Sequence, residues 1–205
     1  MKKEIQRFLF VGNHPCLDLI NTRLMVKGEP RDLLESVDDL FLWLRQAKLL
    51  TASQAKMAEI HLHKEEAASL LERVKTFRTT LRIVAERIAA GKAVPDSAID
   101  AINQLLAQRP GYTILVRTKE GIKRRFHSLV ATQQVELLAS LLESTSDLLC
   151  SGRLCLIKKC ANAACILYFL DTTKNHTRNW CSMQMCGNRM KVAAHYRRSR
   201  GEASL

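Results

Sequence analysis

Two pairs of cysteines near the end of this 205-residue chain constrain its fold more than any other feature. They are spaced Cys160-x4-Cys165-x15-Cys181-x4-Cys186. Zinc prefers four thiolate or imidazole ligands at the corners of a tetrahedron, and two ligand pairs separated by a loop can supply them. In a reducing compartment, clustered cysteines favour a metal over disulfides. The spacing therefore predicts one structural zinc ion with these four cysteines as its ligands.

A cysteine upstream of the first ligand pair offers an alternative to one of its members. Cys155 precedes Cys160 by the same gap, so Cys155 is an alternative member of that pair. Segment 153–158 has the character of a strand with Cys155 on a packed face, which favours Cys160 with Cys165. His176 and His195 also lie within reach in sequence. The cysteines left outside the site are interpreted as small buried residues: Cys16, Cys150 and Cys155.

Positive charge is concentrated in the same region. The chain has a net charge of +12, and residues 151–205 hold ten Lys and Arg against two acidic residues. A local excess of this kind indicates a polyanionic partner, although many basic tails serve only solubility.

The hydrophobic content of 47% is that of a folded protein rather than a disordered one. No apolar run approaches the 18 residues of a membrane span. The apolar start is broken at Gly12, Asn13 and His14, which does not fit a signal peptide. We therefore expect a cytoplasmic protein without a membrane segment.

The period of the apolar residues predicts a fold that is mainly α with one β-hairpin. Ser36 is placed to cap a helix, and Gly91 to end a long helical stretch. Residues 112–126 are β-branched and aromatic on both sides of a glycine turn, which indicates the hairpin. The segments expected to be helical are 15–25, 36–51, 53–91, 96–108 and 129–152.

Two domains follow from this pattern. Residues 1–152 are expected to form a helical N-terminal domain with its own core. Residues 153–205 hold few large apolar groups and are expected to form a small treble-clef-like zinc finger, in which a strand carries one cysteine pair and a helix the other. Because so short a segment builds little core, the metal must supply much of its folding free energy.

The expected finger helix carries the candidate nucleic-acid contacts. Lys191, His195 and Arg198 fall at i, i+4 and i+7, on one face, where they suit phosphate contacts. Val192 and Tyr196 lie on the adjacent side and are expected to pack against Phe169 or Trp180. The full set of candidate contacts is Arg178, Asn188, Arg189, Lys191, His195, Arg197, Arg198 and Arg200.

Two of these residues have competing interpretations. Arg189 and Asn188 are candidates for base recognition, since arginine pairs with guanine and asparagine with adenine. Asn188 also suits a turn or cap that satisfies backbone groups at the metal loop, and this is the role that we favour. Arg189 is equally suited to a bond with a cysteine sulfur or a carbonyl.

Polar residues interrupt the first helical segment. Asp18, Asn21 and Arg23 are candidates for a small-molecule effector pocket, because buried polar groups need partners. The alternative, which we favour, is a structural network, for example Asp18 with an arginine.

The segment "WCSMQMCGNRMKVAAHYRR" resembles the bacterial zinc finger named for its Cys-Gly-Asn-Arg (CGNR) motif, over about 153–200. Upstream, "VGNHPCLDLINT" and "LFLWLRQAKLL" resemble the ABATE domain that usually precedes this finger. The resemblance implies a stress-response transcription regulator with a zinc-dependent DNA-binding tail. It also implies Cys160, Cys165, Cys181 and Cys186 as the ligands.

The sequence favours DNA-binding transcription regulation as the function. A homodimer and a small-molecule effector are further possibilities. RNA or ribosome association through the same finger is one alternative, and a protein-interaction finger is another. An enzyme is not expected, because four thiolates leave no open coordination position on zinc.

Overall fold

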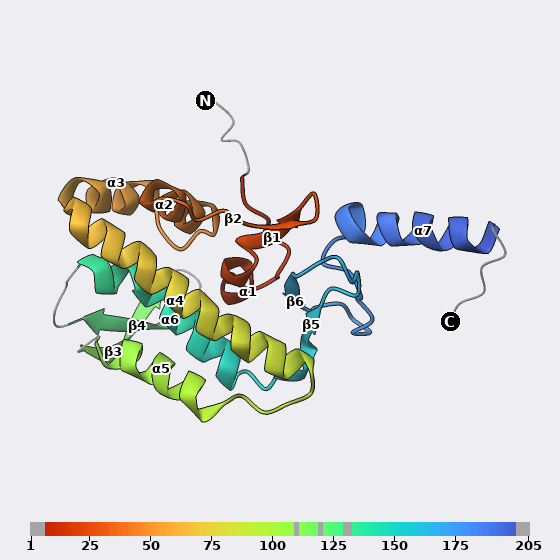
Figure 1. The fold of residues 1–205 in the computed structure, drawn as a ribbon. Coiled ribbons are helices and arrows are strands. Elements are labelled where there is room, and N and C mark those ends of the chain that lie inside the picture. Colours follow the sequence, from red (N-terminus) through yellow and green to blue (C-terminus); the bar gives the residue numbers. More distant parts are fainter. Residues whose placement is uncertain (1–6, 109–110, 119–120, 129–132, 200–205) are drawn as a thin grey trace.

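A 26-residue helix, α4 (Lys64–Ala89), runs through the middle of the molecule in the computed structural model (Figure 1). The structure describes residues 7–108, 111–118, 121–128 and 133–199. Helix α4 contacts α1, α2, α5 and α6, and also the strand β5 of the C-terminal region. The other helices are α1 (Pro15–Ile20), α2 (Val37–Gln46), α3 (Ala52–His61), α5 (Asp96–Ala107), α6 (Gln133–Cys150) and α7 (Asn188–Ser199).

The described strands form three separate antiparallel pairs. The pairs are β1 (Arg23–Val26) with β2 (Glu29–Asp32), β3 (Gly111–Thr118) with β4 (Gly121–Ser128), and β5 (Ile157–Lys159) with β6 (Tyr168–Leu170). A short 3-10 turn, η1 (Leu154–Leu156), precedes β5, and a single π-helical turn, η2 (Met183–Gly187), leads into α7. The fold class predicted from the sequence is confirmed, including the hairpin β3–β4.

Local sequence signals fix several helix ends. The Ser36 hydroxyl accepts a hydrogen bond from the Asp39 amide at 3.2 Å, and Asp39 binds back to the Ser36 amide, which completes a capping box. Gly91 follows α4 with a φ of 67°, and the next amide, that of Lys92, donates to the carbonyl of Arg87 at 2.8 Å. Glycine favours this left-handed conformation, so the helix ends there as predicted.

The hairpin β1–β2 was not predicted. The sequence indicated a helix over 15–25 and a loop after it, whereas α1 ends at Ile20. The Thr22 hydroxyl donates to the carbonyl of Leu19 at 2.7 Å, which satisfies a helix-end carbonyl and ends the helix. Lys27 and Gly28 then make the two-residue turn with positive φ values of 51° and 90°.

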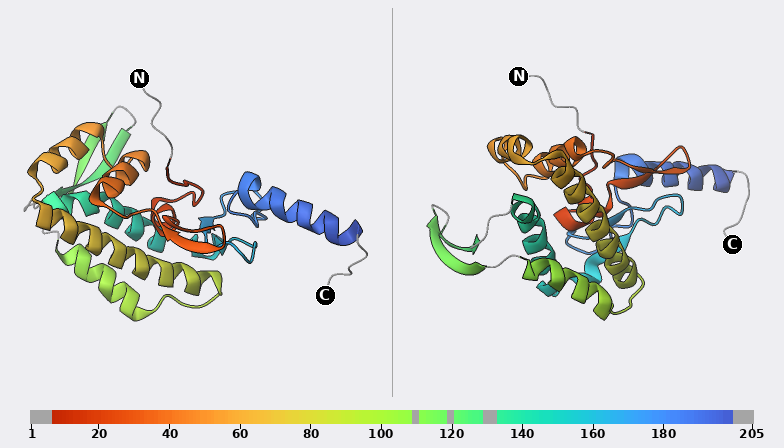
Figure 2. Two further views of the ribbon diagram at one scale, coloured as in Figure 1. Left: turned by 45° about the horizontal axis from the view of Figure 1, so that its top comes forward. Right: turned by 60° about the vertical axis from the view of Figure 1, so that its left-hand side comes forward.

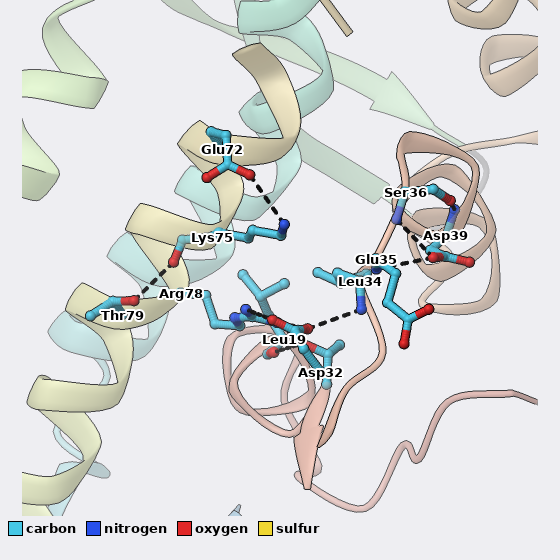
Figure 3. Close-up of polar contacts among 11 residues, drawn as sticks. Leu19, Asp32, Leu34, Glu35, Ser36, Asp39, Glu72, Lys75, Arg78 and Thr79 are labelled. Atoms are coloured by element: carbon cyan, nitrogen blue, oxygen red, sulfur yellow. Dashed lines mark hydrogen bonds and ion pairs between the residues drawn. The ribbon is translucent and has the colours of Figure 1, made fainter. Parts of the chain in front are cut away.

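An ion pair fixes this hairpin to the long helix (Figure 3). The Arg78 guanidinium, from α4, donates to Asp32 at the end of β2, with one bond of 2.7 Å. It also donates to the Thr22 hydroxyl at 2.8 Å. Arg78 is buried, so its charge requires these partners.

The main core extends from the helical region into the C-terminal strands. It includes Trp43 and Phe77 together with Tyr168 and Leu170 of β6. The finger strands are therefore packed on the helical domain and share its apolar core. Helix α7 and the β3–β4 hairpin lie toward opposite ends of the molecule, and the right-hand view of Figure 2 shows the hairpin standing away from the helices (Figures 1 and 2).

Candidate metal centre

Four buried cysteine sulfurs meet at one point beside β6. The Sγ atoms of Cys160, Cys165, Cys181 and Cys186 all lie within 4.8 Å of one another. The Cys165–Cys181 sulfur distance is 3.8 Å, and the Cys181–Cys186 distance is 3.5 Å. A zinc–sulfur bond of about 2.3 Å in a tetrahedron places neighbouring sulfurs about 3.8 Å apart. The four side chains therefore fit one tetrahedral zinc ion, as predicted.

Two short turns bring the ligands together. Cys160 follows β5 and Cys165 precedes β6, and the Cys160 amide donates to the carbonyl of Leu167 at 2.9 Å. Cys181 lies just before η2, and Cys186 lies within it. The Cys186 amide donates to the Ser182 carbonyl at 3.0 Å. One pair is therefore held by a strand ribbon and the other by the start of a helix, which is the treble-clef-like arrangement.

The sulfurs carry hydrogen bonds suited to thiolates. The Cys181 amide donates to the Cys160 sulfur at 3.4 Å, and the Asn162 side-chain amide donates to the Cys186 sulfur at the same distance. Donors of this kind orient metal ligands and reduce the charge on them. Asn162 itself is buried, and its role was not predicted from the sequence.

The four thiols cannot all ionise without a cation. Contact with the Cys181 thiol lowers the pKa of Cys165 to about 5. The same contact and burial raise the pKa of Cys181, so one thiolate forms at the expense of the next. A divalent cation removes this conflict, because zinc binds the deprotonated form of every ligand.

Steric contacts explain why glycine occupies position 187 in the Cys-Gly-Asn-Arg motif. A Cβ atom on Gly187 would lie 2.6 Å from the Met183 sulfur and 3.1 Å from Cδ1 of Trp180. The next residue, Asn188, donates its amide to the Met183 carbonyl and joins η2 to α7. This bond is made by the backbone, so the turn or cap role favoured for the Asn188 side chain stays a prediction.

Two cysteines outside the site differ from expectation. Cys150 and Cys155 are exposed, whereas both were interpreted as buried. The strand expected over 153–158 is instead η1 followed by β5, and this turn directs Cys155 outward. Cys155 is therefore not a member of the sulfur cluster. Cys16 is buried as predicted, and its sulfur lies 3.1 Å from the Thr145 hydroxyl.

A buried carboxylate organises the loop between the two cysteine pairs. Asp171 accepts from the Lys158 ammonium at 2.8 Å, from Thr173, and from the Arg178 amide at 3.0 Å. Burial opposes its charge, but these donors hold the pKa of Asp171 well below its usual range. Sequence reasoning missed this residue. The signal available was a lone acidic residue followed by two threonines, typical of a side chain that binds nearby amides.

Arg178 is half-buried, and its guanidinium is bound within the protein. Its guanidinium donates to the carbonyls of Val11 at 2.8 Å and Trp180 at 2.9 Å, and also to that of Cys181. It stacks over the Phe169 ring, 4.1 Å from the centroid. Burial lowers the pKa of Arg178, and nearby anionic groups oppose that shift. These contacts give Arg178 a structural role, so it is not one of the proposed nucleic-acid contacts.

The three candidate effector residues are placed differently from one another. The Asp18 carboxylate accepts from the Gly12 amide at 2.7 Å, and the Asn21 side chain binds the backbone of Tyr168. Arg23 is exposed on β1. The contacts of Asp18 and Asn21 match the structural network that we favoured over an effector pocket.

Helix α7 presents its charged residues to solvent. Asn188, Arg189, Lys191, His195 and Arg198 are all exposed. Within the described residues, Arg189 has no bond to a cysteine sulfur or a carbonyl, so that interpretation loses its basis. Arg197 belongs to α7 by its backbone, and Arg200 lies outside the described residues.

Val192 and Tyr196 of the same helix do not pack against Phe169 or Trp180. Val192 is 55% exposed and Tyr196 is 61% exposed. The expected packing is therefore wrong. The reason is the direction of α7, which leaves the finger and points away from the body (Figure 2).

The fold and the sulfur cluster define a helical domain joined to a finger with one structural zinc ion. Comparison with known families agrees with this description. The ABATE family, described as a putative stress-induced transcription regulator, matches residues 13–152, and the CGNR zinc finger matches residues 157–199. The chain belongs to the ABATE family and ends in a CGNR zinc finger. A separate comparison with curated proteins found no match. None of the helices in the described part of the chain has the length and apolar character of a membrane span.

Proposed function

We propose that this protein is a transcription regulator that binds DNA through the exposed cationic face of α7. The observation that carries the proposal is the surface of that helix. Lys191, His195 and Arg198 are exposed on one face, and no acidic residue occurs between Asn188 and Ser199. Among the described residues, neither Lys191 nor Arg198 has an ion-pair partner. A projecting helix with this charge suits the phosphates beside a DNA groove.

The zinc ion supports this function structurally. Four buried sulfurs fill the tetrahedral positions of zinc, which leaves none for a substrate. We therefore propose a binding protein rather than an enzyme. The metal fixes η2, and η2 fixes the start of α7, so zinc sets the direction in which the cationic face points.

The test is the salt dependence of binding to a duplex of about 20 base pairs, followed by fluorescence anisotropy. Log affinity falls as log salt rises, and the substitutions Lys191→Ala and Arg198→Ala together should make this slope less steep by about 2. The matched control replaces two exposed lysines of the helical domain, Lys56→Ala and Lys92→Ala. Equal slopes in the two double variants, with zinc retained, would contradict the proposal. Competition with single-stranded and duplex RNA separates the RNA alternative from DNA.

A second candidate function has its own support. Val192 and Tyr196 are exposed one turn apart on α7, and exposed apolar residues at this spacing suit a protein partner or a second copy. Under this candidate, Tyr196→Ser would change the mass in sedimentation equilibrium from dimer to monomer. If the unsubstituted chain and Tyr196→Ser are both monomers, a second copy is not the partner of this surface.

A further inference from the structure

A groove of about 440 Å³ lies between the helical domain and the finger. One wall is the β1–β2 hairpin, from Leu24 to Gly28. The other is formed by the zinc knuckle and the start of α7, including Met185 and Arg189. The hairpin tip lies beside the beginning of α7 in each view (Figures 1 and 2). The groove is therefore continuous with the helix that carries the cationic face.

The groove combines two cations with apolar walls. Lys27 from the hairpin and Arg189 from α7 both line it and both are exposed, and no carboxylate is among the lining residues. Within the described residues, neither cation has an ion-pair partner. The remaining wall is largely apolar, with Leu24 and Met185 as examples. Walls of low dielectric constant focus the field of such charges and concentrate anions between them.

Lys27 occupies an uncommon position for a lysine. Its φ of 51° and that of Gly28, 90°, define a two-residue turn that usually holds asparagine or aspartate followed by glycine. A long side chain is rarely found in this left-handed conformation. The turn brings Lys27 to the tip of the hairpin, where it lines the groove.

The charge balance makes both cations necessary. Zinc with four thiolates carries a net charge of about −2, and Cys165 and Cys186 line the groove. Lys27 and Arg189 together offset that charge, so the loss of either one leaves a net negative charge beside the groove that opposes an anion. Without Lys27, Arg189 alone would face the metal centre, and an anion in the groove would be bound more weakly.

We propose that the groove holds one phosphate of the nucleic-acid strand that α7 contacts, between Lys27 and Arg189. The inference rests on the proposed function and adds the helical domain to the binding surface. It assigns Lys27, a residue outside the finger, to phosphate binding. The helical domain would then bind the strand through the β1–β2 turn, and the finger would bind the same strand through α7.

The experiment measures anisotropy of a labelled 20-base-pair duplex with the full zinc-loaded chain across a series of salt concentrations. Lys27→Ala should lower the salt slope by about 0.9 and the affinity about five-fold at 0.15 M salt. Lys48→Ala is the matched control, because Lys48 is also an exposed lysine with a positive φ, of 59°, in the link between α2 and α3. It should leave the slope unchanged.

A double-mutant cycle tests whether the two cations share one phosphate. Arg189→Ala should weaken binding, and adding Lys27→Ala should then cost less than five-fold, because the shared contact is already impaired. If the full chain binds DNA and Lys27→Ala matches Lys48→Ala, this inference is overturned while the proposed function stands. If the full chain binds no DNA at any salt concentration, both are overturned.

Discussion

The side-chain amide of Asn21 binds both backbone groups of Tyr168. Its nitrogen donates to the Tyr168 carbonyl at 2.8 Å, and its oxygen accepts from the Tyr168 amide at 2.9 Å. Both residues are buried. The pair joins the end of α1 to β6 of the finger and fixes the position of one domain on the other. Because Tyr168 lies between the helical core and the zinc centre, this contact links the position of the zinc centre to that of the helical core.

Asn21→Ala should destabilise the protein by about 2–4 kcal/mol. The substitution leaves a buried amide and a buried carbonyl without a side-chain partner, and each unsatisfied group costs about 1–3 kcal/mol. Chemical denaturation followed by circular dichroism measures the effect. Asn103→Ala, at an exposed position of α5, is the control and should change stability by less than about 0.5 kcal/mol. Similar losses for both variants would show that the pair contributes little.

Cys181→Ser should abolish zinc binding and unfold the finger locally. Structural zinc contributes about 10–16 kcal/mol of apparent binding free energy in small fingers. Cys155→Ser is the matched control, since Cys155 is exposed and outside the cluster. We expect one zinc per chain in the control and none in Cys181→Ser, measured by mass spectrometry of the metal. Hydrogen exchange should accelerate over 160–199 and remain slow in α4. Loss of zinc from the control as well would argue against this ligand set.

Asp18→Asn should stabilise the protein increasingly as the pH rises. Burial raises the pKa of Asp18 to about 7, against 3.8 for the free group. Between these values the unfolded chain releases a proton that the folded chain keeps, so rising pH favours unfolding. Asparagine retains the oxygen that accepts from Gly12 and removes this titration.

The gain from Asp18→Asn should grow by about 2–3 kcal/mol between pH 5 and pH 8. It is measured by denaturant unfolding at several pH values. Asp38→Asn removes an exposed carboxylate of α2 and is the control measured in parallel. A flat difference for Asp18→Asn would mean that Asp18 is ionised in the fold at pH 5.

Two glycines should differ in their response to alanine. A Cβ on Gly12 would lie 2.8 Å from the Leu17 Cβ and 2.9 Å from the Asp18 amide nitrogen, which cannot move without the backbone. A Cβ on Gly187 would meet first the flexible end of Met183, at 2.6 Å. Overpacking costs typically about 1–3 kcal/mol. We expect Gly12→Ala to lower the unfolding midpoint more than Gly187→Ala, and the reverse order would contradict the steric argument.

The metal centre was predictable because its information is local. Cysteine spacing indicated two ligand pairs but left Cys155 as an alternative, and strand character favoured the four cysteines that form the cluster. Capping signals such as Ser36 and Gly91 fixed helix ends. Such signals act within a few residues, so the sequence displays them directly. The same reason explains the success with β3–β4, whose turn glycine lies between two β-branched segments.

The errors arose where distant residues decide the outcome. The β1–β2 hairpin is held to α4 by Arg78, which lies 46 residues after Asp32 and binds both Asp32 and Thr22. Val192 and Tyr196 were expected to be covered, but the π-helical turn directs α7 away from the finger. The spacing of apolar residues in the sequence indicates neither the contacts of Arg78 nor the direction of α7. The contact set of Arg178 is of the same kind, since one of its partners is Val11.

Arg178 should prove necessary for stability rather than for DNA contact. Its planar guanidinium reaches three carbonyls and stacks on Phe169, which a lysine ammonium cannot do at once. Arg178→Lys should therefore cost about 1–3 kcal/mol in denaturant unfolding, because buried carbonyls lose charged donors. Lys174→Arg, an exposed change in the same loop, should cost nothing measurable. At temperatures where Arg178→Lys is folded and zinc-loaded, its salt slope on DNA should equal that of the unsubstituted chain. A slope lowered by about 1 would restore Arg178 as a phosphate contact, because each lost contact removes about 0.9 from the slope.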